Sequence, residues 1–192
     1  MNKQKDYLIV IPARFNSSRF PGKLLKKING KSILNHVWEI CVKASNQENV
    51  IVATDHEKII SHCKSKKMRY LMTSSSCLTG TDRLYEVSKK ISSKIYINVQ
   101  GDEPLLSYLE LKKFIKFSLD NSSQVTNAMT KISRRSDFFN FNIPKVVTNE
   151  ENYLLYISRS PIPTTKKGDF KTSNKQVCIY SFPKKAIKDF GE

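Results

Sequence analysis

The first part of the chain alternates short apolar runs with segments of helical periodicity, and this alternation constrains the fold more than any other feature. The predicted strands are Tyr7–Ile11, Asn49–Thr54, Arg69–Thr73 and Lys94–Val99. The predicted helices are Ser32–Ala44, His56–Lys67, Gly80–Ile91 and Tyr108–Leu119. Strands separated by single helices form βαβ units with right-handed crossovers. The pattern therefore predicts an α/β fold with a mostly parallel, Rossmann-like sheet flanked by helices.

Residues 121–192 differ in character, because their β segments follow one another without long helices between them. These predicted β segments are Gln124–Ile132, Pro144–Pro163 and Lys175–Phe182. A polar connection spans Thr164–Asn174, and a helix is expected after it with Pro183 at its first position. We expect a single domain over residues 1–192, in which 1–120 form a βα core and the remainder is a β-rich extension or arm.

The chain is strongly basic, with 33 Lys and Arg residues against 17 Asp and Glu residues and a formal net charge of +16. Such a charge favours a nucleic acid, an acidic surface or an anionic small molecule as the partner, although lysines spread along a whole chain are also typical of a solvated basic surface. A nucleic-acid-binding module interleaves basic residues with exposed aromatic side chains. The aromatic residues here fall mostly in predicted core positions, so we expect no nucleic-acid partner.

The cysteines and the apolar runs argue against several other classes of protein. Cys41, Cys63, Cys77 and Cys178 lie far apart without a C-x-x-C pair, which argues against a structural zinc site and a disulfide framework. No apolar run approaches the ~20 residues that a membrane-spanning helix needs, and the N-terminal run is too short for a signal peptide. The sequence thus predicts a cytoplasmic protein with reduced cysteines and no membrane partner.

The stretch VIPARFNSSRFPGKLL, residues 10–25, follows the first predicted strand and carries three cations, Arg14, Arg19 and Lys23, without any acidic residue. It is neither a P-loop nor a dinucleotide-binding glycine loop, because the patterns G-x-x-x-x-G-K-[ST] and G-x-G-x-x-G are both absent. A loop at the carboxyl end of a parallel strand can nevertheless aim cations and backbone N–H groups at one point. We therefore predict that this stretch binds phosphate.

A second loop, VQGDEP at residues 99–104, follows the fourth predicted strand and holds Asp102 and Glu103. The carboxyl ends of parallel strands share one edge of a sheet, so these acids are expected to face the basic loop. Mg²⁺ prefers carboxylate oxygen and usually takes one or two protein carboxylates together with phosphate and water. A solvated turn is the alternative for this loop alone, but the two loops together predict a magnesium site.

Five stretches, IPARFNSSRFPGK, VATDHE, TGTDRL, NVQGDEP and YISRSPIP, together resemble the 3-deoxy-manno-octulosonate cytidylyltransferase family of sugar-activating cytidylyltransferases. The resemblance runs from about Leu8 to Tyr180, and the order of the motifs makes it specific. It implies a nucleotide-diphospho-sugar-transferase-like fold with a nucleotide-binding core and a β-rich dimerisation arm. It also implies a homodimeric nucleotidyltransferase for lipopolysaccharide biosynthesis. With Mg²⁺ as cofactor, this enzyme would join CTP and an acidic keto-sugar, 3-deoxy-manno-octulosonate (Kdo), into a CMP-sugar and pyrophosphate.

The resemblance further implies roles for individual residues. The triphosphate loop would supply Ala13, Arg14, Ser18, Arg19 and Lys23. The base and ribose side would comprise Gly80, Thr81, Arg83 and Gln100. Asp102 would bind the magnesium ion, and the catalytic set would be Arg14, Lys23 and Asp102. The sugar side would comprise Arg159, Gln176 and Tyr180. Attack of a sugar hydroxyl on the α-phosphorus fits this set, since it needs positioning, cations and a metal more than a protein nucleophile.

Two departures from the family pattern leave alternatives open. The family's HLGIY stretch reads KQVCIY here, so Gln176 stands where histidine is common and Cys178 where glycine is common, while Tyr180 is retained. The acidic sugar is therefore Kdo or a relative such as amino-Kdo or a sialic-acid-like sugar. The family also continues beyond the position of Glu192, with a second magnesium-binding aspartate. The alternative expectation is a C-terminally shortened relative that binds CTP with little turnover.

Overall fold

The computed structural model describes residues 4–16, 20–170 and 172–192. The chain divides into two compact units. The first unit comprises residues 1–126 and 179–192, and the second comprises residues 127–178.

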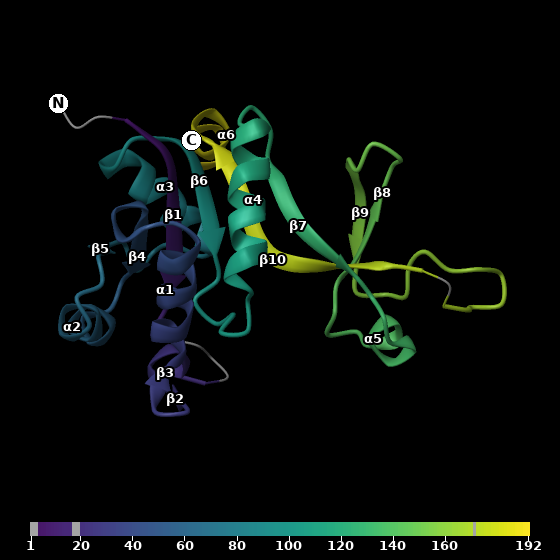
Figure 1. The fold of residues 1–192 in the computed structure, drawn as a ribbon, viewed down its shortest axis with the longest axis horizontal. Helices are drawn as coiled ribbons and strands as arrows, with labels where there is room; N and C mark the ends of the chain where they lie inside the picture. The colour runs from purple at the N-terminus through teal and green to yellow at the C-terminus, as the bar shows by residue number, and fades with distance from the viewer. Residues whose placement is uncertain (1–3, 17–19, 171) are drawn as a thin grey trace. The chain divides into compact units, whose positions relative to one another are not determined.

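The first unit is built on a sheet with the strand order β5-β4-β1-β6-β10 (Figure 1). These strands are β1 (Lys5–Ala13), β4 (Val50–Thr54), β5 (Tyr70–Met72), β6 (Ser93–Val99) and β10 (Asn174–Pro183). The first four strands are parallel to one another, and residues 179–183 of β10 run antiparallel to β6. The predicted α/β fold with a mostly parallel sheet is therefore confirmed.

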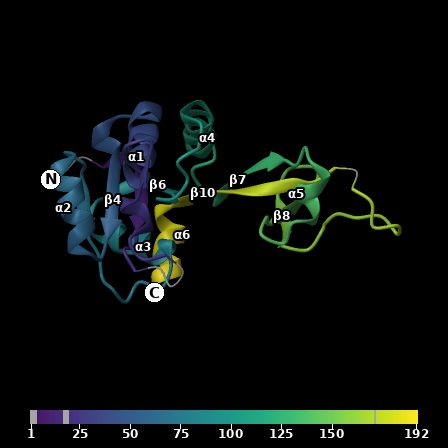
Figure 2. The same cartoon turned by 90° about the horizontal axis from the view of Figure 1, so that it is seen from below.

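Helices cover both faces of this sheet. They are α1 (Ile33–Ala44), α2 (Glu57–Ser65), α3 (Gly80–Lys90), α4 (Tyr108–Asp120) and α6 (Lys184–Gly191). Figure 2 shows α1 and α4 on one face and α3 and α6 on the other, and each pair is also in contact. Because both faces are covered, β1 is apolar without alternation, and Leu8 to Ile11 are fully buried.

On the α3 side of the sheet, apolar residues of the strands and helices form one buried cluster. Leu8 and Val10 of β1 cluster with Leu84 and Val87 of α3 and with Ile187 of α6. Leu84 and Val87 lie three positions apart, so one face of α3 meets the sheet. Helix α1 begins at Ser32, whose side chain accepts a hydrogen bond from the Asn35 N–H and caps the helix.

Two local features differ from the sequence-based predictions. A short hairpin, β2 (Lys27–Ile28) with β3 (Lys31–Ser32), turns at Asn29 and Gly30, whose φ angles are 50° and 79°. These left-handed conformations are those of a two-residue hairpin turn, for which Asn-Gly is the typical sequence. Pro183 caps α6 rather than being its first residue, because it is still extended and paired with Ile95 in the sheet.

The second unit is rich in strands, as predicted for the C-terminal part. It contains β7 (Thr126–Lys131), α5 (Arg135–Phe139), β8 (Lys145–Thr148), β9 (Leu154–Ser158) and the first part of β10. Strand β8 pairs antiparallel with β9 on one side and with residues 174–175 of β10 on the other. The buried ring of Phe138 contacts Phe139 and Phe170, with ring centroids 5.0 Å apart in both cases. The short helix α5 was not predicted.

Cys41, Cys63 and Cys77 are buried and Cys178 is half-buried, as expected for small apolar residues. In the described part of the chain, no helix combines the length and the apolar character that crossing a bilayer demands.

Candidate active site

The loops that carry the predicted charges leave the sheet at one edge. Strands β1 and β6 are parallel neighbours with Val10 opposite Asn98, so the basic loop and the acidic loop both begin at the carboxyl end of the sheet. Strand β4 lies on the other side of β1, with Ala13 opposite Thr54, and delivers the segment after Thr54 to the same edge. Ligands of open α/β sheets bind at this edge.

Gly101 allows the two loops to approach closely. A Cβ atom at this position would lie 3.0 Å from the carbonyl oxygen of Pro12 and 3.3 Å from Cδ1 of Leu24. A side chain at position 101 would therefore push β1 and the short 3-10 helix η1 (Lys23–Leu25) away. With glycine here, η1 packs its buried Leu24 beside the acidic loop and brings Lys23 to it.

Lys23 and Asp102 are in direct contact across this junction. The Lys23 Nζ atom donates to Asp102 Oδ2 at 2.7 Å, and the two side chains are 43% and 44% exposed. The expectation that the acid faces the basic loop is thus met. Burial raises the pKa of the neighbouring Glu103; the charge of Asp102 raises it further, and Lys23 lowers it. The edge therefore holds a cation and two carboxyl groups close together.

The start of the basic loop is fixed by two contacts. Arg14 is exposed, and its Nη2 atom donates to the carbonyl oxygen of Cys77 at 3.1 Å. The Phe15 ring stacks on His56 with centroids 4.0 Å apart, and His56 caps α2 by accepting the Lys58 N–H at its Nδ1 atom. These contacts tie the loop to the segments that follow β4 and β5. The predicted residues Ser18 and Arg19 lie outside the described part of the chain.

The first turn of α3 lies beside the ends of β1 and β6. A Cβ atom on Gly80 would lie 3.3 Å from Pro12, 3.4 Å from Asn98 Nδ2 and 3.6 Å from Gln100 Nε2. Thr79 and Asp82 form a capping box that starts the helix here. The predicted residues Gly80, Thr81 and Gln100 are thereby gathered around a helix N-terminus, whose free N–H groups favour anions.

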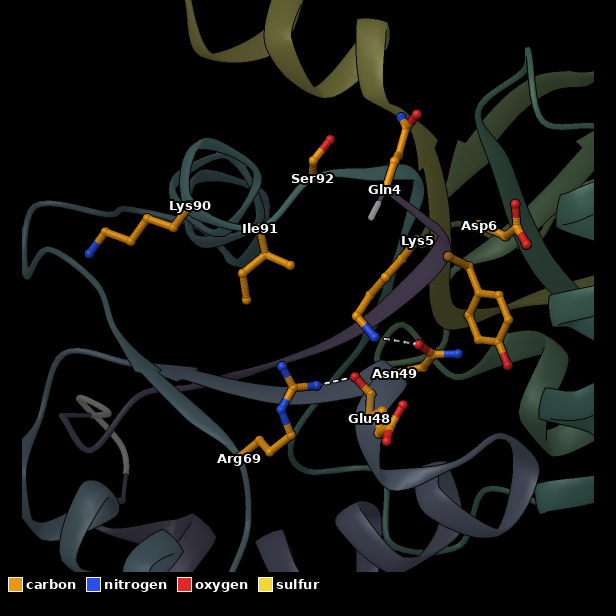
Figure 3. A pocket seen from close by; sticks show the side chains of 10 residues that line it. Gln4, Lys5, Asp6, Glu48, Asn49, Arg69, Lys90, Ile91 and Ser92 are labelled. Carbon is orange, nitrogen blue, oxygen red and sulfur yellow. Dashed lines mark hydrogen bonds between the residues drawn. The ribbon is translucent and has the colours of Figure 1, made fainter. Parts of the chain in front are cut away.

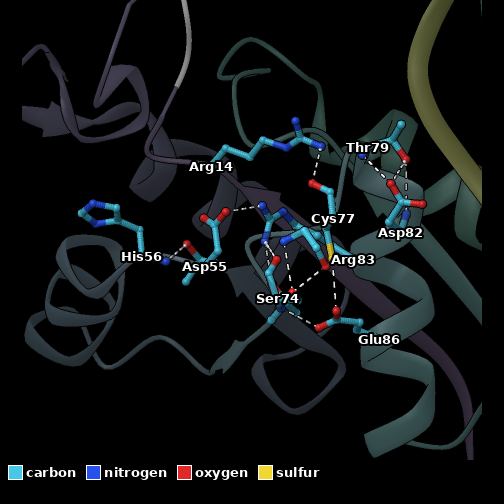
Figure 4. A network of polar contacts seen from close by, with 12 residues as sticks. Arg14, Asp55, His56, Ser74, Cys77, Thr79, Asp82, Arg83 and Glu86 are labelled. Atoms are coloured by element: carbon cyan, nitrogen blue, oxygen red, sulfur yellow. Dashed lines mark hydrogen bonds and ion pairs between the residues drawn. The ribbon is translucent and has the colours of Figure 1, made fainter.

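Arg83 is placed differently from an exposed ligand contact. Its side chain is fully buried, with Nη2 2.6 Å from Asp55 Oδ2 and Nη1 2.7 Å from Thr73 Oγ1. Figure 4 shows this guanidinium between the segments that follow β4 and β5. In this structure Arg83 joins those two segments to α3. A nucleotide contact of its own stays a prediction.

Tyr180 is the one predicted sugar-side residue that belongs to the first unit. It pairs with Asn98 across the antiparallel β10–β6 ladder. Side chains of directly opposed residues lie on the same face of a sheet. Because the Asn98 amide points toward Gly80, Tyr180 lies on the α3 face. The Asn98 Oδ1 atom is buried without a hydrogen-bond partner in the described part of the chain, which makes it a further polar group at this edge.

The other two predicted sugar-side residues belong to the second unit. Arg159 is exposed, and its Nη1 atom donates to the carbonyl oxygens of Phe141 and Asn142, at 3.1 Å each. The Gln176 Nε2 atom donates to Asn127 Oδ1 at 3.2 Å. Both side chains are thus held by contacts within their own unit.

Lys145 was missed by the sequence analysis. It is fully buried in the second unit, and its ammonium group donates to the carbonyl oxygens of Asn140 and Arg159 at 2.8 Å each. Burial, and then the charge of Arg159, lower the pKa of Lys145. This buried cation fixes the backbone at Arg159. The segment KVVT carries no pattern that marks its lysine as buried.

A separate cavity of about 570 Å³ lies at the opposite end of the first unit. Figure 3 shows its lining, which comes from the start of β1, from residues around 48–49 and from the end of α3. None of the predicted site residues lines it. Two contacts in its wall join neighbouring segments: Lys5 Nζ donates to Asn49 Oδ1 at 2.8 Å, and Arg69 donates to the Glu48 carbonyl oxygen. The candidate site is therefore the carboxyl edge rather than this cavity.

The chemistry of the carboxyl edge suits a metal-bound phosphate. Among the described residues, no group of three or more His, Cys, Asp or Glu side chains is arranged to hold a metal ion. Asp102 and Glu103 do fit Mg²⁺, which takes one or two carboxylates and completes its shell with phosphate and water. Cations, carboxylates and a helix N-terminus at the carboxyl edge of a parallel sheet are typical of nucleotide-binding α/β proteins.

Comparison with known proteins defines the family within this class. The sequence profile of the cytidylyltransferase family matches residues 8–192. The chain is 44% identical over 177 residues to a 3-deoxy-manno-octulosonate cytidylyltransferase of Geotalea daltonii, covering 88% of this chain and 70% of that protein. It is 37% identical over 195 residues to the enzyme of that name from Geobacter sulfurreducens, covering 95% and 78%.

A solved structure gives the same result. CMP:2-keto-3-deoxy-manno-octonic acid synthetase complexed with CTP superposes with a TM-score of 0.90 at 34% identity, covering 97% of this chain and 77% of that one. The chain belongs to the cytidylyltransferase family and is therefore a nucleotidyltransferase.

Proposed function

We propose that this chain transfers CMP from CTP to Kdo, releasing pyrophosphate, as a step of lipopolysaccharide biosynthesis. The names of its relatives support the substrates, and so does the CTP complex of the similar synthetase. The observation that carries the proposal is the meeting of Lys23 with Asp102 at the carboxyl edge of the sheet. A site for a metal-bound triphosphate needs a cation for phosphate and a carboxylate for the metal at the same point.

In this proposal the basic loop and the acidic loop share the triphosphate. Lys23 leaves Asp102 and binds phosphate oxygens together with Arg14. Asp102 holds Mg²⁺, with Glu103 beside it. When bound, Mg²⁺ neutralises charge on the phosphate oxygens. The protein's own contribution is to position CTP for in-line attack by the sugar hydroxyl and to stabilise the charge that builds on the leaving pyrophosphate.

The remaining predicted residues are assigned to base, ribose and sugar. Gly80, Thr81 and Gln100 surround the N-terminus of α3, where backbone N–H groups are available to the nucleotide. Arg83 is assigned a supporting role, because its ion pair with Asp55 holds the first turn of α3 against the segment that follows β4. Arg159 is assigned to the carboxylate of the sugar, with Gln176 and Tyr180 as further contacts. Lys145 supports Arg159, because it binds the carbonyl oxygen of that residue.

The second unit carries the surface that we assign to a homodimer. Strand β9 ends the strand order of the sheet and pairs with β8 alone among the described strands. Its residues Leu154, Leu155 and Tyr156 are 54%, 64% and 62% exposed. An apolar edge strand of this kind can pair with a strand of another chain through its backbone N–H and C=O groups. In a two-fold symmetric dimer, the same strand of a second copy would be that partner.

The test is pyrophosphate release from CTP with Mg²⁺ and Kdo, compared with amino-Kdo and a sialic acid. We expect release with Kdo and a loss of release when Asp102 is replaced by Asn. Release with another acidic sugar but not with Kdo would identify that sugar as the substrate. Calorimetric CTP binding without release from any of these sugars would support the alternative of a CTP-binding relative with little turnover. Absence of both CTP binding and release would refute the proposal.

A further inference from the structure

Among the described residues, the carbonyl oxygen of Cys77 is the hydrogen-bond partner that orients the Arg14 guanidinium. The Arg14 side chain is exposed, so in water it samples many rotamers, and holding it in one of them costs conformational entropy. The guanidinium position therefore depends on where the Cys77 carbonyl is held. Figure 4 shows this carbonyl reaching Arg14 from the loop between β5 and α3.

Side chains of α3 hold the loop around Cys77. Glu86 accepts two hydrogen bonds from it: the Ser74 N–H at 2.7 Å on Oε2 and the Cys77 thiol at 3.3 Å on Oε1. Arg83, one turn earlier on the same face of α3, donates to Thr73 and more weakly to the Ser74 carbonyl oxygen. Both carboxylate oxygens of Glu86 are thus used by one loop.

The chemistry of Glu86 suits a holding role. The Ser74 N–H and the Cys77 thiol, which donate to Glu86, are neutral groups. Hydrogen bonds from neutral donors to an ionised carboxylate are shorter and about twice as strong as those between two neutral groups. Burial, and then the Glu86 hydrogen bond, raise the pKa of Cys77 to about 11, so the thiol keeps the proton that it donates. Glu86 therefore binds the loop at two points, the Ser74 amide and the Cys77 thiol.

We propose that Glu86 is a positioning residue for Arg14, acting through the Cys77 carbonyl. The chain of contacts runs from the Glu86 carboxylate to the Cys77 thiol and Ser74 amide, then along the backbone to the Cys77 carbonyl, and finally to the Arg14 guanidinium. Glu86 touches no reacting atom. The inference rests on the proposed function in one respect, which is that Arg14 binds the CTP triphosphate.

A double-mutant cycle on CTP binding tests this chain of contacts. The variants are Arg14→Ala, Glu86→Ala and the double variant, with CTP affinity measured by calorimetry. Glu86→Gln keeps an acceptor for the Ser74 N–H while removing the charge, and serves if Glu86→Ala folds poorly. Glu39→Ala, which removes an exposed carboxylate from α1, is the matched control. Melting temperatures verify that each variant is folded.

We expect Arg14→Ala to weaken CTP binding by about tenfold or more, the range for losing a charge-assisted contact. Glu86→Ala should weaken it several-fold, Glu86→Gln less, and Glu39→Ala not at all. In the Arg14→Ala background, Glu86→Ala should have no further effect. Independent, multiplying effects, or parent affinity in folded Glu86→Ala or Glu86→Gln, would overturn the inference alone. Parent affinity in Arg14→Ala would refute the place of Arg14 in the proposed site and the inference with it.

Discussion

Lys23 and Asp102 form an ion pair of 2.7 Å, although 79 positions separate them in the sequence. Both side chains remain partly exposed, and surface pairs of this kind typically contribute less than about 1 kcal/mol to stability. The pair can therefore be exchanged for other contacts at small cost. In the proposed function, Lys23 exchanges Asp102 for phosphate oxygens and Asp102 exchanges Lys23 for Mg²⁺.

Replacing Lys23 by Met should weaken CTP binding by ~1–3 kcal/mol, the range for losing a hydrogen bond to a charged group. Titration calorimetry measures the affinity. Lys27→Met, which removes an exposed cation a few residues away in β2, is the matched control and should bind CTP like the parent. Equal affinities in Lys23→Met and the parent would show that Lys23 is not part of the triphosphate site.

Replacing Asp102 by Asn should remove the magnesium-dependent part of CTP binding and of turnover. The amide is nearly the same size but carries no charge for a hard cation. The measurement is CTP affinity with Mg²⁺ and with EDTA. For the parent, we expect Mg²⁺ to strengthen binding, and for Asp102→Asn we expect the two affinities to coincide. A variant that still gains as much from Mg²⁺ as the parent would rule out Asp102 as the metal ligand.

The pKa of Glu103 should respond to both members of the ion pair. Burial raises it above its ordinary value of 4.5, Asp102 raises it further and Lys23 lowers it. Asp102→Asn should therefore lower the pKa of Glu103, and Lys23→Met should raise it, as measured by carboxyl carbon NMR during a pH titration. A shift in the opposite direction in either variant would contradict the arrangement.

The same shift has a consequence for stability. Because the pKa of Glu103 is higher in the folded than in the unfolded chain, the folded chain holds this proton more tightly. The contribution of Glu103 to the free energy of unfolding is full below about pH 4.5 and is lost as the pH rises through the folded value.

Replacing Arg83 by Met should destabilise the chain by ~3–5 kcal/mol, because it leaves Asp55 without its buried partner. Urea unfolding measures the change. Lys89→Met, an exposed substitution on the same helix, should stay within about 0.5 kcal/mol of the parent. Parent stability combined with lost CTP affinity in Arg83→Met would instead mean that Arg83 acts on the nucleotide.

Replacing Leu155 by Glu should convert the proposed homodimer into a monomer, because it puts a charge into the apolar edge that we assign to the interface. Sedimentation velocity measures the oligomeric state over a range of concentrations. Leu78→Glu changes a leucine that is 81% exposed in the first unit and should leave the dimer intact. A parent chain that sediments as a monomer at every concentration would refute the homodimer.

The βα core and the meeting of its two charged loops could be predicted from the sequence, because both follow from strand order. Buried parallel strands are apolar without alternation, and their carboxyl ends share an edge. Once the strands ending at Ala13 and Val99 are neighbours, Lys23 and Asp102 lie at the same edge whatever the details of the loops. The Asn29–Gly30 pair is a typical hairpin turn, but the strands that flank it are only two residues long and show no strand pattern in the sequence.

The partners of buried charges could not be predicted in the same way. Arg83 lies four residues before Val87, on the apolar stripe of α3, and this position signals burial. Periodicity names no partner, however, and Asp55 comes from a strand end that only the folded sheet brings near. The burial of Lys145 is harder still to predict. Its two partners are the backbone carbonyl oxygens of Asn140 and Arg159, and a pattern of side chains does not reveal backbone partners.

Gly101 and the two acidic residues that follow it should tolerate substitution differently. Space limits position 101, whereas charge limits positions 102 and 103. A Cβ atom at 101 would lie 3.0 Å from a backbone oxygen, which is tighter than an ordinary contact, so saturation mutagenesis should favour glycine there. Asp102 is exposed and Glu103 is half-exposed, and neither position is sterically closed. Selection at 102 and 103 should therefore act mainly on charge, so that the charge of the edge can change in related chains while its geometry is inherited unchanged.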